Sequence, residues 1–319
     1  MGALACRTGV VVGEELLLYS FPEGHPMNNS RVRQFFARLE EAKAFERPGV
    51  VKVQPTMADE DTILQFHTRE HLSFVKASSL RGDGYLDGGD TPAYKGVFEA
   101  ASYVVGSTVK LLELVASGEV THGFNPVGGL HHARRDSSAG FCVFNDIGVA
   151  IELAKRRYGL SPLLYVDMDA HHGDGVYYSY EGDPEVFIFD SHEDGRHLYP
   201  GTGFEWEEGT GKARGTKVNV PLQPGAGDGD FREAFKKALR LAERAKPQLV
   251  ILQAGGDCLA GDPLTHLSLS SSSHRYATEE LVKVSHTYCE GRLIALGGGG
   301  YNPKGVAEAW LQVVLGLSH

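Results

Sequence analysis

Carboxylate and histidine side chains that could bind a metal ion gather in one short segment and at one distant position. Residues 167–174 read DMDAHHGD, and Asp257 follows two glycines much later in the chain. Asp169 and His171 are two residues apart, so on an extended segment both side chains point to the same side. With Asp257 they could form a set of two carboxylates and one imidazole that leaves positions open for water and substrate. Because no thiolate belongs to this set, Zn²⁺ is not dictated, and Fe²⁺, Co²⁺ or Mn²⁺ could also bind.

Two adjacent histidines, His131 and His132, could carry out acid–base chemistry beside such an ion. Histidine titrates near neutral pH, and a water molecule activated by a metal needs a proton acceptor. Each imidazole would need a carboxylate on its second nitrogen to orient it, and Asp167 and Asp174 are the natural candidates. Tyr301 follows four glycines, so its hydroxyl could lie where an oxyanion develops.

Short apolar runs rich in β-branched residues alternate with helical patterns along most of the chain. Strands are expected at 50–53, 163–166, 186–189, 217–220, 249–253 and 293–296, with two more within residues 8–19. Helices are expected at about 30–45, 59–66, 71–78, 94–116, 147–157, 231–245, 278–288 and 304–314. This alternation predicts an α/β fold with a central, mostly parallel sheet flanked by helices. Neither a repeat nor a linker interrupts it, so residues 1–319 are expected to form a single domain.

The candidate residues follow three of these predicted strands. Residues 167–174 come after the strand at 163–166, Asp257 after the strand at 249–253, and Tyr301 after the strand at 293–296. Ligands of open parallel sheets bind outside the carboxyl ends of the strands. We therefore expect these side chains to converge at one edge of the sheet.

Composition narrows the classes of function. With 31 lysines and arginines against 41 aspartates and glutamates, the net charge of −10 argues against direct binding to nucleic acid or to an anionic membrane. The four cysteines are far apart and form no C-x-x-C motif, which indicates a reducing compartment. The first residues resemble neither a signal peptide nor a myristoylation site, and no apolar run reaches the ~18 residues of a membrane span. We expect a cytoplasmic protein.

Several longer motifs around these residues resemble those of the metal-dependent histone deacetylase family. The resemblance is to the branch shared by class I deacetylases and bacterial acetoin-utilisation proteins, and it runs in collinear order from about His25 to the end of the chain. The motifs are GGLHHA at 128–133, SAGFCVFND at 138–146, VDMDAHHGDGV at 166–176, YPGTG at 199–203, GGDCLAGDP at 255–263 and LGGGGY at 296–301.

The resemblance implies a three-layer arginase–deacetylase fold and a zinc-dependent lysine deacetylase, a hydrolase acting on linear amides. Such an enzyme removes the acetyl group from N-acetyl-lysine side chains of proteins or peptides by attack of a metal-activated water molecule. Matched by position, the metal ligands are Asp169, His171 and Asp257. The matched catalytic residues are His132 as general base and acid, His131 as its electrostatic partner, Tyr301 as oxyanion donor, and Asp167 and Asp174 behind the histidines.

The resemblance also implies residues that bind the substrate. Gly140, Phe141 and Tyr199 match tunnel walls that grip the lysine methylenes, and Asp90 matches an aspartate that holds the substrate backbone. Leu264 stands at the position of a rim residue that is a glutamate in relatives selective for polyamines, so an apolar residue here disfavours a polyamine substrate. Arg31 matches an arginine of an inner channel for acetate.

One departure from the family and several alternatives remain open at this point. Asp190 replaces a serine that commonly belongs to a site for K⁺, so binding of that cation is expected to be altered. Alternative functions are an amidohydrolase of acetylpolyamines or other small molecules, a binuclear ureohydrolase-like enzyme, and a non-catalytic acetyl-lysine binder. The ureohydrolase chemistry would need an aspartate at position 173, where Gly173 stands. The acylated substrate, the choice between acetyl and longer acyl groups, and the oligomeric state are not determined by the sequence.

Overall fold

Eight strands form one sheet in the computed structural model, which describes residues 6–22 and 24–318. The sheet order is β2-β1-β3-β8-β7-β4-β5-β6, and all seven pairings among these strands are parallel. The predicted α/β class with a mostly parallel sheet is therefore confirmed. The strands are β1 (Thr8–Val11), β2 (Val50–Val53), β3 (His122–Asn125), β4 (Leu163–Asp167), β5 (Val186–Glu193), β6 (Lys217–Leu222), β7 (Leu249–Gln253) and β8 (Leu293–Leu296).

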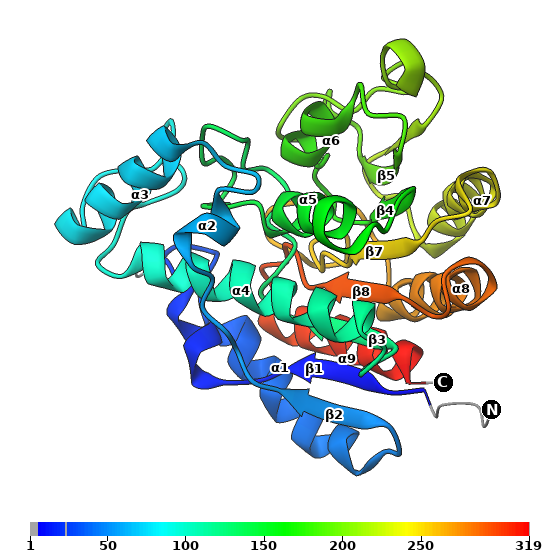
Figure 1. Cartoon of the computed structure of the whole chain (residues 1–319), viewed down its shortest axis with the longest axis horizontal. Helices are drawn as coiled ribbons and strands as arrows, with labels where there is room; N and C mark the ends of the chain where they lie inside the picture. Colours follow the sequence, from blue (N-terminus) through cyan, green and yellow to red (C-terminus); the bar gives the residue numbers. More distant parts are fainter. Residues whose placement is uncertain (1–5, 23, 319) are drawn as a thin grey trace.

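Helices flank the sheet in two groups (Figure 1). In one group α1, α9, α8 and α7 pack against one another in succession, and in the other α3, α4, α5 and α6 do so. None of the helices in the described ranges is both long enough and apolar enough to cross a membrane. The helices are α1 (Ser30–Glu41), α2 (Glu60–Ile63), α3 (Arg69–Arg81), α4 (Val97–Ala116), α5 (Asp146–Tyr158), α6 (Asp174–Tyr180), α7 (Asp228–Ala245), α8 (Ser271–Tyr288) and α9 (Pro303–Leu317).

The central strands β4, β7 and β8 are buried along their whole length. Their sequences, LLYVD, LVILQ and LIAL, are continuous apolar runs that end, in β4 and β7, on one polar residue. This pattern is expected for strands covered on both faces, where no residue can point to water. The polar end residues, Asp167 and Gln253, lie in register as neighbours. The carboxyl ends of these strands thus place polar side chains within the buried core.

Several predicted elements differ from the structure, among them the helices expected at 30–45 and 59–66, which are shorter. The second strand expected within residues 8–19 is wrong, since Glu14–Leu18 forms a short 3₁₀ helix in which Leu16 and Leu17 are buried and Leu18 is half exposed. The helix expected from 278 begins earlier, at Ser271, because the Ser270 hydroxyl accepts a hydrogen bond from the backbone of Ser272. Strand β3 and helix α6 were not predicted. The expectation about the N-terminal segment concerns residues 1–6, of which the first five lie outside the described ranges.

A buried carboxylate, Asp146, holds the loop that carries the histidine pair. It lies at the start of α5 and accepts hydrogen bonds from the backbone N–H groups of Gly129 (3.1 Å) and Leu130 (2.9 Å). The Thr108 hydroxyl of α4 donates to the same carboxylate at 2.7 Å. Asp146 is fully buried, so water cannot replace these donors. The position of His131, one residue after Leu130, therefore depends on α4 and α5.

Replacing this carboxylate should destabilise the protein. Asp146→Ala leaves buried donors unpaired, each costing about 1–3 kcal/mol, so the free energy of unfolding should fall by on the order of 3 kcal/mol. Urea denaturation measures this change, and Asp136→Ala, at an exposed aspartate of the same segment, is the matched control. An Asp146→Ala protein as stable as the control would contradict the assigned role of the loop contact.

Candidate active site

The three predicted metal ligands converge at the carboxyl ends of β4 and β7. The Nδ1 atom of His171 lies 3.1 Å from Asp169 Oδ1 and 3.1 Å from Asp257 Oδ2. One ligand atom from each residue lies within 4.8 Å of the others, and the two aspartates are buried. Two carboxylates and one imidazole with this spacing fit a divalent transition-metal ion with positions left open for other ligands. The site lies at the edge of the sheet formed by the carboxyl ends of the strands, as predicted from the sequence.

The backbone holds both ligand carboxylates, and one glutamine also holds that of Asp169. Gln253, the last residue of β7, donates from Nε2 to Asp169 Oδ2 at 2.7 Å, and the backbone N–H of Gly299 donates to the same oxygen at 2.8 Å. Asp257 Oδ1 accepts a hydrogen bond from the backbone of Ala170 at 2.8 Å. Each carboxylate therefore has an oxygen fixed by the protein, while the other oxygen faces His171.

Burial and mutual repulsion destabilise this pair of carboxylates unless a positive charge lies beside it. Burial and the neighbouring charge of Asp169 raise the pKa of Asp257 to about 7. Burial opposes the charged form of His171, but hydrogen bonds and attraction from Asp169 and Asp257 prevail and raise its pKa to about 10. A proton on His171 thus supplies the positive charge when no cation is bound. A divalent cation would take over that task and leave the imidazole neutral, as a ligand must be.

The histidine pair is oriented by two carboxylates, as the sequence predicts. His131 Nδ1 donates to Asp167 Oδ2 at 2.8 Å, and His132 Nδ1 donates to Asp174 Oδ1 at 2.7 Å. The two Nε2 atoms lie 3.1 Å apart, with both residues buried. These contacts leave the Nε2 atoms of His131 and His132 as the reactive ends of the rings.

The two rings differ in charge. Burial lowers the pKa of His131, but the carboxylates of Asp167 and Asp169 outweigh burial and raise it to about 10. Burial and the positive charge of His131 lower the pKa of His132 to about 4. At neutral pH His131 is therefore positive, whereas His132 is neutral and able to accept a proton.

A narrow cavity is lined by two of the metal ligands, Asp169 and His171, by the histidine pair and by Tyr301. Its volume of about 10 Å³ leaves room for about one water molecule. Tyr301 and Phe141 lie next to each other, with ring centroids 5.8 Å apart and planes at 87°. Burial raises the pKa of Tyr301 well above its ordinary value, so its hydroxyl stays protonated as a donor. The cavity is lined by Met27, Gly129, Leu130, His131, His132, Gly140, Cys142, Asp169, His171, Gly298, Gly299 and Tyr301.

Gly140 and Phe141 adopt left-handed backbone conformations beside the cavity. Their φ angles are 53° and 66°, and a side chain at Gly140 would place its first carbon 2.5 Å from the ring of His132. A positive φ is unfavourable for a bulky residue such as Phe141 and persists only where surrounding contacts impose it. Here the Thr91 hydroxyl accepts from the Phe141 N–H at 3.0 Å, and the Tyr19 hydroxyl donates to its carbonyl at 2.7 Å. The aromatic ring is thereby held facing Tyr301.

The other predicted substrate-binding residues lie at the outer surface. The Tyr199 ring is 45% exposed, with its centroid 5.1 Å from that of His132. Tyr199 and Asp90 line the same open groove of about 500 Å³. Leu264 is also exposed, and it is linked to the site through Asp262, which accepts hydrogen bonds from the backbone N–H groups of both Leu264 (2.9 Å) and Tyr301 (2.7 Å). Within the described ranges 6–22 and 24–318, Leu264 is not among the residues that line the cavity.

Three residues that hold the site were missed from the sequence. Gln253 fixes Asp169, Asp262 fixes the backbone of Tyr301, and Arg134 donates to Asp174 Oδ2 at 3.1 Å. The signal for Gln253 is a polar residue at the end of an otherwise apolar strand. The signal for Asp262 is its place in the GGDCLAGDP motif. Arg134 offers no comparable signal, because an arginine in a surface loop is usually solvated.

Two further positions raised by the sequence are charged and buried. Asp190 accepts hydrogen bonds from His192 Nδ1 at 2.6 Å and from the backbone of Gly173 at 2.9 Å. Since His192 Nε2 also donates to the Gly203 carbonyl, both ring nitrogens carry protons and His192 is a cation. Arg31 donates from one nitrogen to the carbonyls of Gly298 (2.9 Å) and Gly300 (3.3 Å). The charge of Asp190 is thus compensated within the chain.

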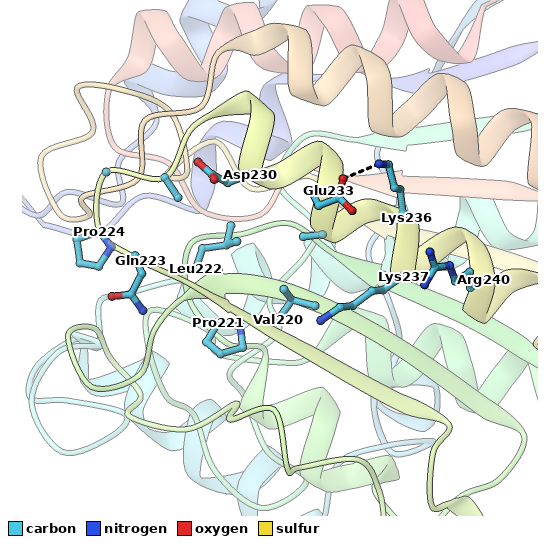
Figure 2. A pocket seen from close by; sticks show the side chains of 13 residues that line it. Val220, Pro221, Leu222, Gln223, Pro224, Asp230, Glu233, Lys236, Lys237 and Arg240 are labelled. Atoms are coloured by element: carbon cyan, nitrogen blue, oxygen red, sulfur yellow. Dashed lines mark hydrogen bonds and ion pairs between the residues drawn. The ribbon is translucent and has the colours of Figure 1, made fainter.

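A wider hollow lies between β6 and α7 (Figure 2). It measures about 610 Å³, and its charged side chains include the ion pair of Glu233 and Lys236, with Lys237 and Arg240 farther along α7. Its lining residues include no histidine or cysteine, and none of the predicted site residues is among them. Size therefore does not identify the active site here, whereas the convergence of ligands and titratable groups does.

Residues 25–317 match the family model of the histone deacetylase domain. The chain belongs to the histone deacetylase family. It is 38% identical over 312 residues to the acetoin utilization protein AcuC of Bacillus subtilis (strain 168), which covers 92% of this chain and 79% of that protein. The AcuC protein of Staphylococcus xylosus is 33% identical, with 99% of this chain and 84% of the relative covered. The crystal structure of the HDA15 HD domain matches with a TM-score of 0.90 at 30% identity, covering 98% of this chain and 88% of that one.

Membership of the histone deacetylase family confirms the resemblance and the arginase–deacetylase fold predicted from the motifs. Every predicted site residue, from Asp90 to Tyr301, lies within the matched range. The roles of the individual residues rest on the geometry described above.

The glycines behind the ligands give a direct test of the metal site. A first side-chain carbon at Gly299 would lie 2.2 Å from Asp257 Oδ2 and 2.8 Å from Asp169 Oδ2, so Gly299→Ala must displace both carboxylates. We expect the affinity for Zn²⁺ to fall about 10- to 100-fold, the range seen when contacts behind metal ligands are lost. Isothermal titration with Zn²⁺ measures this loss.

Gly305→Ala is the matched control, because its new carbon would lie 3.6 Å from the nearest side chain, an ordinary contact. This variant should bind Zn²⁺ as the unmodified chain does. Equal affinities for Gly299→Ala and Gly305→Ala would show that these carboxylates do not hold the ion.

Proposed function

We propose that this chain is a zinc-dependent hydrolase that removes acetyl groups from N-acetyl-lysine side chains of proteins or peptides. One observation carries the proposal: Asp257 lies with Asp169 and His171, and these last two share one narrow cavity with two carboxylate-oriented histidines and Tyr301. Amide hydrolysis needs an electrophile, a base and an oxyanion donor around the reacting carbonyl. Family membership supports the deacetylase class.

The residues divide this chemistry among them. An ion held by the three ligands, Zn²⁺ or alternatively Fe²⁺, would polarise the acetyl carbonyl and lower the pKa of an attacking water molecule. His132, neutral at pH 7, accepts the proton of the attacking water at Nε2 and later delivers it to the departing lysine amine. Asp174 holds the His132 ring and stabilises its charged form. His131, kept positive by Asp167, favours negative charge developing nearby.

Tyr301 stabilises the tetrahedral intermediate. Its hydroxyl is protonated at neutral pH and emerges from the glycine run beside the ligands. Such a donor gains strength when the carbonyl oxygen becomes an oxyanion, so it lowers the barrier more than it strengthens substrate binding.

Recognition of the substrate falls to the outer residues. The acetyl-lysine side chain is slender and uncharged, so the Phe141 and Tyr199 rings and Gly140 suit its methylenes. Asp90, at the rim, accepts hydrogen bonds from the peptide backbone. Leu264 offers no negative charge to the second amine of an acetylpolyamine, which favours a peptide over this alternative substrate.

The binuclear alternative meets a steric obstacle at Gly173. A first side-chain carbon there would lie 2.6 Å from Asp167 Oδ2 and 3.1 Å from His131 Nδ1, so an aspartate as second-metal ligand has no room. A cytoplasmic location and K⁺ at a structural site, with its binding altered by Asp190, are also part of this proposal. No nucleic acid, membrane or particular oligomer is part of it.

Removing the oxyanion donor should slow turnover without releasing the metal. For Tyr301→Phe we expect kcat on an acetyl-lysine peptide to fall about 10²- to 10³-fold, with Zn²⁺ content unchanged. His132→Ala should lose about 10²- to 10⁴-fold, since the base is gone. Acetate release by the purified protein loaded with Zn²⁺ or Fe²⁺ measures both. Absence of acetate release by the unmodified chain, or faster release from an acetylpolyamine than from every peptide, would overturn the proposed substrate class.

Substrate binding should depend on pH through Asp90. Partial burial and the adjacent Asp87 carboxylate raise the pKa of Asp90 to about 6. As the pH falls through 6, Asp90 gains a proton and can no longer accept two backbone hydrogen bonds as a carboxylate, so KM for a peptide should rise. Asp90→Asn should have a KM about tenfold higher and without this inflection, because hydrogen bonds to a charged group contribute about 1.5–3 kcal/mol.

The control for this test is an N-acetyl-alkylamine that lacks a peptide backbone. Its KM should not respond to Asp90→Asn, since the aspartate has nothing to bind. A peptide KM that is flat between pH 5 and 7 in the unmodified chain would rule out the assigned role of Asp90.

A further inference from the structure

A second group of metal-ligating side chains lies outside the active site. Cys6, His122 and His286 each present one ligand atom within 4.8 Å of the others. They come from three distant parts of the sequence: the segment before β1, the first residue of β3 and the last turn of α8. The register pairs Thr8 of β1 with His122 of β3, which brings Cys6 beside the histidine.

This group lies at the opposite edge of the sheet from the active site. All strands are parallel, so the starts of β1 and β3 lie at the edge away from the carboxyl ends that carry Asp169 and Asp257. In Figure 1 the C-terminal end of α9 lies at the same side as the start of β1. The two groups therefore cannot share one ion.

His122 is buried with one ring nitrogen unsatisfied. It is fully inaccessible to solvent, and its Nδ1 lies 2.6 Å from the carbonyl of Leu317, to which it donates. Because Nδ1 donates to this carbonyl, Nε2 is the ring nitrogen left to bind a ligand. Nε2 has no hydrogen-bond partner in the described part of the chain. A backbone carbonyl that fixes the tautomer of an imidazole is the usual support of a histidine that binds a metal.

The other two side chains complete a set suited to zinc. One ligand atom of Cys6 lies within 4.8 Å of one on each histidine, and the rings of His122 and His286 are perpendicular with centroids 5.3 Å apart. Cys6 and His286 also line an open pocket of about 360 Å³, which gives an ion a path from solvent. One thiolate and two imidazoles favour Zn²⁺ over Mg²⁺ or Ca²⁺, which prefer oxygen.

We propose that Cys6, His122 and His286 bind a second zinc ion, with a water molecule as fourth ligand, and that this ion ties the segment before β1 to α8. The thiolate distinguishes the site from the active centre, which contains no sulfur ligand. The proposal does not depend on the chain being a deacetylase.

Cobalt provides the test, because Co²⁺ replaces Zn²⁺ and a cysteine ligand gives an intense near-ultraviolet charge-transfer band. The full chain titrated with Co²⁺ should bind about two ions and show this band. Asp257→Asn should lose the active-centre ion and keep the band. Cys6→Ser should lose the band and about one ion while retaining deacetylation, and His286→Ala should weaken binding of that ion about tenfold or more.

Matched controls separate the site from general effects of substitution. Cys289→Ser keeps the hydrogen bond of the Cys289 thiol to the Arg292 carbonyl, and His197→Ala removes an exposed histidine elsewhere. Both should retain the band. Absence of the band in the unmodified chain, or its persistence in Cys6→Ser, would overturn the proposal. Because the band is read without substrate, failure of deacetylation alone leaves this result unaffected.

Discussion

Aspartates buried where the central strands end impose the constraint on which the rest of the structure depends. Asp167, Asp169 and Asp257 are at most 1% exposed and lie close together. Burying each charge costs several kcal/mol unless donors or opposite charges compensate it. The fold supplies both. Histidine rings form hydrogen bonds with some of the aspartate oxygens, and backbone N–H groups and Gln253 donate hydrogen bonds to the others. The contacts that compensate the buried charges are therefore the same contacts that position the residues of the site.

Glycine allows the backbone to come close enough to donate hydrogen bonds to these carboxylates. At Gly299 and Gly128 a first side-chain carbon would lie 2.2 Å and 2.6 Å from the nearest carboxylate oxygen. Only a residue without a side chain lets the main chain come this close, so these turns donate N–H groups where a larger residue would expel the carboxylate. The strained backbone of Phe141 serves the same end, because it holds an aromatic wall against Tyr301.

The features predicted best from the sequence are those that a parallel sheet requires, namely its buried strands and the edge at which they end. β7 and β8 have the predicted bounds, and the rule that strand ends face one edge placed Asp169 close to Asp257 and on the same cavity as Tyr301. The prediction failed for β3, whose sequence HGFN includes two residues that are uncommon in strands. This strand is nevertheless buried, because neighbouring elements cover it. Missing β3 also concealed the group around His122. Gln253 and Asp262 were missed because their function is to position other residues, which spacing alone does not reveal.

Crystals of Tyr301→Phe grown with Zn²⁺ and an acetyl-lysine peptide would test the central claim most directly, by anomalous diffraction at the zinc edge. The account predicts an anomalous peak bound by Asp169, His171 Nδ1 and Asp257, with the uncleaved acetyl group beside His132 and the lysine methylenes between Phe141 and Tyr199. A crystal with no zinc among these three residues, or with the acetyl group bound away from His132, would contradict it.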